Sequence, residues 1–120
     1  MHPIILVAAG SAVGGAARWA MAGWLDARLD AEVRMWGTLA VNIIGGLLIG
    51  ACAALLEREA LRLLLITGVL GGFTTFSAYS LQTMQLLQAG RPLAAGAYAL
   101  GSVLACLLAC WAGWGLARLL

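Results

Sequence analysis

The sequence predicts an all-α membrane protein with four transmembrane helices. Of its 120 residues, 63% are hydrophobic and 10% are charged, whereas a soluble domain is nearer half apolar and a quarter charged. A helix that spans a bilayer needs about 20 predominantly apolar residues. Four such stretches follow one another, at residues 4–24, 36–56, 63–88 and 92–117. Because only short connectors separate them, we expect a single four-helix transmembrane domain.

The first apolar stretch also has the length of a signal peptide. A signal peptide begins with a basic region, but only His2 precedes this apolar run. We therefore expect residues 4–24 to be retained as a transmembrane helix.

The arginines are balanced between the two sides of the predicted membrane. Lysine is absent, and with four spans both termini and the second connector share one side. That side carries Arg58, Arg62 and Arg118, the other carries Arg28, Arg34 and Arg91, and Arg18 lies inside the first span. The positive-inside rule selects one orientation only when one side has an excess of basic residues. The balance predicts insertion in both orientations, as a dual-topology antiparallel homodimer would require.

The sixteen glycines indicate close helix packing. Small residues at a spacing of four let helices approach closely in lipid, and this spacing occurs at Gly10/Gly14, Gly46/Gly50 and Gly68/Gly72. Packing within the chain is the simplest explanation for most of them. Four short helices do not easily enclose a pathway, however, so a transport role would also require a dimer.

The three cysteines do not form a recognisable metal or disulfide pattern. Cys52, Cys106 and Cys110 all fall inside predicted spans, and their number is odd. A disulfide framework or a zinc site is therefore not expected.

Polar residues inside the spans are candidates for function, because they are costly in lipid. Asn42 lies in the middle of the second span, where it serves either as a hydrogen-bond clamp between helices or as part of a pathway. Tyr98, Ser102 and Cys106 are spaced four apart and form one stripe of hydrogen-bond donors. Arg18 either reaches back to the membrane surface or attracts anions.

The residue types that are missing from the spans narrow the function. No Asp or Glu lies in any span, and His2 is the only histidine. Proton-coupled export needs an intramembrane proton carrier, and a membrane haem needs axial ligands. No nucleophile–base pair is visible, so we do not expect an enzyme, and nothing indicates nucleic-acid binding. The inventory favours passage of a small anion past hydrogen-bond donors.

The third stretch is predicted to be broken at its centre. Gly71 and Gly72 each cost about 1 kcal/mol of helix propensity relative to alanine, and the β-branched Thr74 and Thr75 follow. Broken helices mark ion sites in membrane proteins, and freed backbone carbonyls can hold a small cation. In an antiparallel dimer, two such breaks would meet and could cage one Na⁺.

Two aromatic residues follow the predicted break. Phe76 and Tyr79 are three apart and share one helix face. Aromatic rings have a positive edge, which can meet an anion without a full charge, and Ser77 adds a donor. Ordinary aromatic packing is the alternative.

Taken together, these residues resemble the Fluc (CrcB-type) fluoride channels over essentially the whole chain. The matching residues are Gly14 and Gly15 with Arg18, then Gly37 and Thr38 with Asn42 and Gly45, then the block GGFTTFS at Gly71–Ser77, and finally the stripe Tyr98, Ser102 and Cys106.

The resemblance implies a dual-topology dimer in the cell inner membrane that exports fluoride passively and selectively. It implies that Phe76, Asn42 and Ser77 line the pore, with Tyr98 and Ser102 on a polar track of the fourth helix. It also implies that the carbonyls of Gly71 and Thr74 hold a structural Na⁺ shared between the subunits.

Three residues depart from the usual pattern of that family. Tyr79 stands where a second phenylalanine is usual, Gln82 where many members have glutamate, and Cys106 where serine or threonine is common. We expect these departures to affect throughput more than the ion that passes.

Two other functions remain open from the sequence. A small four-helix multidrug exporter would share the size, the glycines and the mixed orientation, but it would need an intramembrane carboxylate. A structural subunit of a larger membrane complex would need no polar stripe and would conduct nothing by itself.

Overall fold

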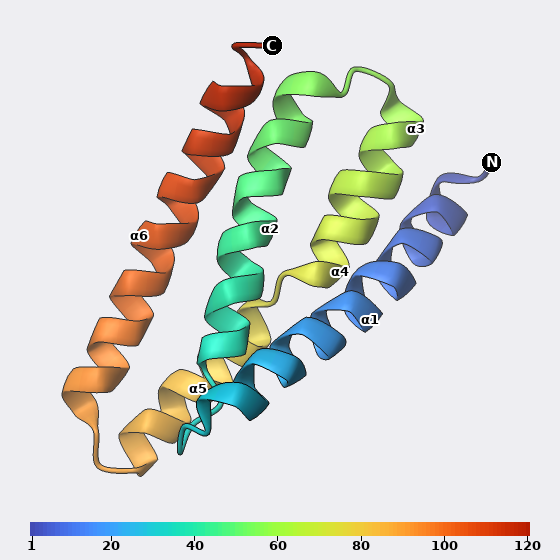
Figure 1. Cartoon of the computed structure of the whole chain (residues 1–120). Coiled ribbons are helices and arrows are strands. Elements are labelled where there is room, and N and C mark those ends of the chain that lie inside the picture. The colour runs from blue at the N-terminus through green and yellow to red at the C-terminus, as the bar shows by residue number, and fades with distance from the viewer.

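The computed structural model describes all 120 residues, Met1–Leu120, and is helical throughout, without strands. Four helical segments are long and apolar enough to cross a membrane. They are α1 (Pro3–Leu29), α2 (Trp36–Leu55), the composite segment Glu59–Gln88 and α6 (Pro92–Ala117). The prediction of an all-helical protein with four transmembrane-type helices is confirmed (Figure 1).

The third segment consists of several shorter helices. Its elements are α3 (Glu59–Leu61), the π-helix η1 (Arg62–Leu70), α4 (Gly71–Phe73) and α5 (Phe76–Gln88). Helical backbone stops after Phe73 and resumes at Phe76, so that Thr74 and Thr75 connect the two halves.

Two helix boundaries differ from the expected spans. Helix α1 continues five residues beyond residue 24, and the third segment begins at Glu59 instead of residue 63. Both extensions contain charged residues, such as Asp26 in α1 and Glu59 itself. Hydropathy detects only the part of a helix that fits the hydrocarbon layer, about 30 Å thick, whereas helices continue into the headgroup region.

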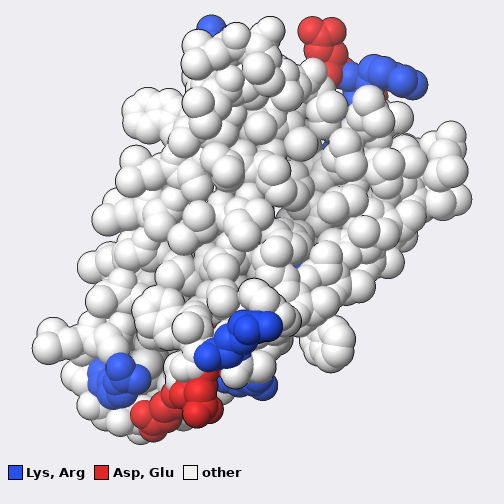
Figure 2. All heavy atoms as spheres, viewed as in Figure 1, with Lys and Arg blue, Asp and Glu red and all other residues white.

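The four segments run alternately up and down (Figure 1). Both termini and the α2–α3 connector lie at one end, and the connectors 30–35 and 89–91 lie at the other. The charged side chains visible in Figure 2 gather at these two ends, with a band almost without charge between them. This distribution matches a molecule that crosses a bilayer lengthwise.

The spaced glycines pack the helices within the chain. A Cβ on Gly10 of α1 would lie 2.8 Å from the Cα of Gly68 in η1, and one on Gly72 would lie 2.7 Å from the Ser11 carbonyl oxygen. A Cβ on Gly46 of α2 would lie 3.1 Å from the Cys106 carbonyl oxygen of α6. The expectation that most of these glycines serve intramolecular packing is confirmed.

Side chains from neighbouring helices satisfy both ends of α2. Met35 at the N-cap gives no side-chain hydrogen bond, and the Asp26 carboxylate accepts one from the Gly37 N–H instead, at 2.9 Å. At the other end, Arg62 Nη1 donates to the carbonyl oxygen of Leu56, at 2.9 Å. Helix ends leave backbone groups without partners inside the helix. These two bonds each supply one such partner, and they connect α2 to α1 and η1.

Candidate functional site

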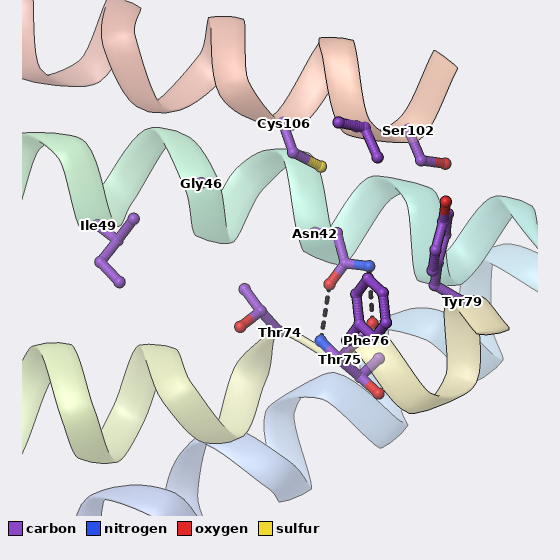
Figure 3. A pocket seen from close by; sticks show the side chains of 10 residues that line it. Asn42, Gly46, Ile49, Thr74, Thr75, Phe76, Tyr79, Ser102 and Cys106 are labelled. Atoms are coloured by element: carbon purple, nitrogen blue, oxygen red, sulfur yellow. Dashed lines mark hydrogen bonds between the residues drawn. The ribbon is translucent and has the colours of Figure 1, made fainter. Parts of the chain in front are cut away.

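The third segment borders a cavity of about 300 Å³ between α2, α5 and α6 (Figure 3). Its lining residues are Asn42, Gly46, Ile49, Thr74, Thr75, Phe76, Tyr79, Ser102, Val103 and Cys106. We call it the central cavity. Five of the eight residues predicted for an ion pathway line it, namely Asn42, Phe76, Tyr79, Ser102 and Cys106, whereas Arg18, Ser77 and Tyr98 do not.

The wall of this cavity contains the interruption between α4 and α5. Thr74 (φ −88°, ψ 156°) and Thr75 (φ −150°, ψ 120°) are extended, a conformation that suits β-branched residues. The Thr75 hydroxyl accepts a hydrogen bond from the Ala78 N–H at 3.1 Å and so caps α5.

The glycine pair that the sequence analysis placed at the centre of a break is itself helical. Gly71 has φ −62° and ψ −37°, and both glycines belong to α4. Of the residues named for the predicted break, Thr74 and Thr75 are non-helical, whereas the glycine pair is helical. Gly72 instead allows α4 to approach Ser11 of α1, where any larger residue would collide with backbone.

Asn42 satisfies both backbone groups of Thr75. Its Nδ2 donates to the Thr75 carbonyl oxygen at 3.0 Å, and its Oδ1 accepts from the Thr75 N–H at 2.7 Å (Figure 3). Non-helical backbone at membrane depth is tolerated only where such partners exist. Asn42 therefore acts as a clamp between α2 and the interruption, and it also lines the cavity.

Arg18 contacts α4, just before the interruption, from the α1 side. Its Nε donates to the Gly72 carbonyl oxygen at 3.1 Å, in a half-buried position. Arg18 does not line the central cavity. Its charge is held beside α4 instead of reaching back to the membrane surface.

The aromatic residues form a connected series. The ring centroids of Phe76 and Tyr79 are 5.1 Å apart, and those of Tyr79 and Tyr98 are 5.6 Å apart. The Tyr79 hydroxyl donates to the Ala99 carbonyl oxygen of α6 at 2.9 Å, which fixes its ring. Phe76 makes no such bond and is 76% exposed.

Tyr98 belongs to a partly buried hydrogen-bond chain. Its hydroxyl donates to Gln82 Oε1 at 2.8 Å, and Gln82 Nε2 donates to the Thr38 hydroxyl at 2.7 Å. This chain joins α2, α5 and α6. The sequence marked Gln82 as unusual and Thr38 as a motif residue, but their bond joins positions 44 apart and could not be inferred from spacing.

The Ser102 hydroxyl oxygen is the one buried side-chain polar atom without a hydrogen-bond partner. Ser102 is 5% exposed, and its hydroxyl makes no hydrogen bond. A buried unsatisfied group costs about 1–3 kcal/mol, so such groups usually mark a place for water or a ligand. Ser102 also borders a second cavity of about 430 Å³, next to Tyr98 and Arg91. The stripe on α6 is therefore divided, because Cys106 faces the central cavity, Tyr98 the second, and Ser102 both.

Ser77 lies outside both cavities. Its side chain is exposed, and its hydroxyl is 3.1 Å from that of Thr75. It contributes to the N-terminus of α5 in this chain.

These features define a class of protein, a multi-pass helical membrane protein with a mainly apolar cavity between its spans into which a few polar side chains project. The family described as "CrcB-like protein, Camphor Resistance (CrcB)" matches residues 5–114. The chain belongs to this family. The match covers nearly its whole length and agrees with the resemblance found in the sequence.

Several relatives carry the name fluoride-specific ion channel FluC. The protein of Rhizobium leguminosarum bv. trifolii (strain WSM2304) is 45% identical over 125 residues, which cover 100% of this chain and 99% of that protein. The protein of Geobacter sulfurreducens is 45% identical over 123 residues, with 98% of each chain covered. That of Agrobacterium fabrum is 43% identical, again with 98% of each covered.

Proposed function

We propose that this chain is a fluoride-selective ion channel that exports fluoride passively and so lowers its concentration in the cytoplasm. The observation that carries the proposal is the central cavity between the spans, whose mainly apolar wall contains the uncharged hydrogen-bond donors Asn42, Ser102 and Cys106 and no charged residue. The names of its full-length relatives support the choice of ion. The proposal contains no catalytic step.

The fluoride pathway runs along the central cavity. Fluoride is small and strongly hydrated, so a selective pathway must replace its water with hydrogen-bond donors. Asn42, Ser102 and Cys106 supply such donors, and the exposed ring of Phe76 supplies a positive edge. Tyr79 contributes its ring only, because its hydroxyl already donates to Ala99.

The remaining candidate residues act around the cavity. Arg18 contributes positive potential from behind α4, where its charge is half-buried. Tyr98 lines the second cavity, beyond Ser102, and belongs to the same route. Ser77 serves the route from the exposed start of α5, where the second subunit completes the wall.

The functional unit is a dual-topology antiparallel homodimer in the cell inner membrane. Its basis is the arginine balance at the two ends of the molecule, where Figure 2 also locates the visible charges. The highly exposed Phe76 leaves one wall of the cavity uncovered, and a second copy would cover it.

A structural Na⁺ would bind at the dimer interface through the carbonyls of Gly71 and Thr74. The surroundings fit such a site, because Gly71 is exposed, a Cβ there would meet nothing closer than 3.6 Å, and Thr74 is extended. Bound Na⁺ would neutralise the carbonyl dipoles of two facing interruptions and hold the subunits together.

Passive transport suffices for export. Hydrogen fluoride enters cells as a neutral acid and dissociates at neutral pH, and a negative-inside potential then drives each fluoride out with about 2.3 kcal/mol per 100 mV. A multidrug exporter would instead need an intramembrane carboxylate, and none of the residues that line the central cavity carries one.

The test is fluoride efflux from liposomes that contain the purified protein, read with a fluoride electrode while valinomycin carries compensating K⁺. We expect fast, protein-dependent fluoride release and negligible chloride release from a parallel sample. Absence of fluoride release from well-folded reconstituted protein would refute the proposal.

A further inference from the structure

One of the three free thiols faces the central cavity. Cys106 lines it, whereas Cys52 and Cys110 do not. In Figure 3 the Cys106 sulfur points from α6 toward the side of the cavity where Asn42 and Phe76 lie. The three thiols of this chain therefore differ in the space that a reagent would find beside them.

A second observation indicates that polar molecules reach this thiol. Ser102 lies one helical turn before Cys106, lines the same cavity, and keeps its buried hydroxyl without a partner. Water or another polar molecule in the cavity would supply the missing hydrogen bond. Because the rest of the cavity lining is mainly apolar, a small uncharged reagent is the kind that suits this space.

We propose that Cys106 is a modification site for small thiol-reactive electrophiles, and that its modification obstructs ion passage. The effect on passage rests on the proposed function, but the modification itself does not. With methyl methanethiosulfonate, the Cys106 thiol loses its proton to water and its sulfur attacks the sulfenyl sulfur of the reagent. A disulfide bond forms, the S–SO₂ bond breaks, and methanesulfinate leaves with the electron pair.

The product would narrow the cavity and remove a donor. The added methylthio group replaces the S–H, so the side chain can no longer donate a hydrogen bond. The added group would occupy the cavity itself, because Cys106 forms part of its lining. Modification should therefore act on passage both sterically and chemically.

The experiment treats proteoliposomes of three proteins with methyl methanethiosulfonate. They are the wild type, the double variant Cys52→Ala/Cys110→Ala, in which Cys106 is the only thiol, and Cys106→Ser, which keeps the other two. Peptide mapping by mass spectrometry measures methylthio addition. Fluoride efflux is compared with the untreated sample of the same variant, so differences in basal flux do not matter.

We expect addition of one methylthio group at Cys106 in the wild type and the double variant, and in the wild type it should be faster than at Cys52 and Cys110. Most of the efflux should be lost and should recover after dithiothreitol. The Cys106→Ser variant should lose none of its fluoride efflux after treatment. Slower labelling of Cys106 than of Cys52 and Cys110 would overturn the site, and labelling of Cys106 with unchanged efflux would overturn the obstruction. If the untreated wild type releases no fluoride, the proposed function fails, while the labelling order still decides the site.

Discussion

At the scale of single residues, Asn42 and Tyr79 use polar groups to bind backbone atoms of the chain, a role that residue type alone does not reveal. Asn42 uses one donor and its acceptor on Thr75, so it is a clamp as well as a cavity residue. Tyr79 uses its hydroxyl on Ala99 and presents only its ring. Both side chains position the α4–α5 interruption and α5, and their roles can be separated by substitution.

Replacing Asn42 with alanine should reduce both fluoride flux and stability. The change leaves the N–H and carbonyl of Thr75 without partners, and each unsatisfied buried group costs about 1–3 kcal/mol. Efflux assays and thermal unfolding in detergent measure the two effects. Ile44→Ala, at a more exposed position on the same helix, is the control and should change neither. Wild-type flux in Asn42→Ala would remove Asn42 from the pathway.

Phe76→Ile should depress fluoride flux with little loss of stability. Isoleucine keeps much of the bulk but has no aromatic edge, and the Phe76 ring is largely exposed, so few contacts within the chain are lost. Fluoride efflux compared with the thermal midpoint tests this expectation. Full activity of the variant would contradict coordination by the ring edge.

Tyr79→Phe should keep fluoride flux but lower stability by about 0.5–1.5 kcal/mol, the usual net value of one hydrogen bond. The ring remains while the bond to Ala99 is lost. Tyr98→Phe serves as comparison, because it leaves a Gln82 oxygen unpaired in a partly buried chain and should cost more. A large loss of flux in Tyr79→Phe would show that the hydroxyl itself takes part in passage.

At the scale of helices, close backbone contact holds α1 against the third segment. Gly10 of α1 and Gly68 of η1 approach so closely that no side chain fits between them. Arg18 and Ser11 add polar contacts from α1 to the same segment, to the carbonyls of Gly72 and Gly68. The position of the interruption therefore depends on the packing of α1.

Gly10→Ala should destabilise the protein by about 1–3 kcal/mol, the usual range for overpacking. The added Cβ would lie 2.8 Å from both the Gly68 Cα and the Val69 nitrogen, which are backbone atoms and cannot rotate away. Gly23→Ala is the matched control on α1, because a Cβ there meets nothing within 4 Å. Equal midpoints of the two variants in thermal unfolding would contradict this account of the helix contact.

At the scale of the whole molecule, the charges lie at two ends with equal numbers of arginines. Arg58, Arg62 and Arg118 lie at the end with the termini, and Arg28, Arg34 and Arg91 at the other. Neither end has the excess that would select one orientation. The dual topology proposed for this chain should therefore be sensitive to small changes of charge.

Arginines added at one end should fix the orientation and abolish transport. Leu119→Arg/Leu120→Arg adds two charges at the terminal end, and Gln88→Arg/Leu93→Arg adds two at the opposite end, all at exposed positions. Either variant alone should fail to protect cells from fluoride, whereas the two expressed together should restore protection. Full protection by one variant alone would contradict an antiparallel dimer. Leu119→Gln/Leu120→Gln controls for the loss of apolar side chains.

Four transmembrane-type helices, close glycine packing and the family were determined by the sequence itself, because hydropathy, spacing and local motifs are properties of contiguous residues. The extent of α1 and the helical state of Gly71 were not, since they depend on polar surroundings and on contacts between helices. The partners of Asn42, Tyr79 and Gln82 were also decided by tertiary structure. Each of their bonds joins residues at least 16 positions apart, and such pairs are brought together only when the helices pack.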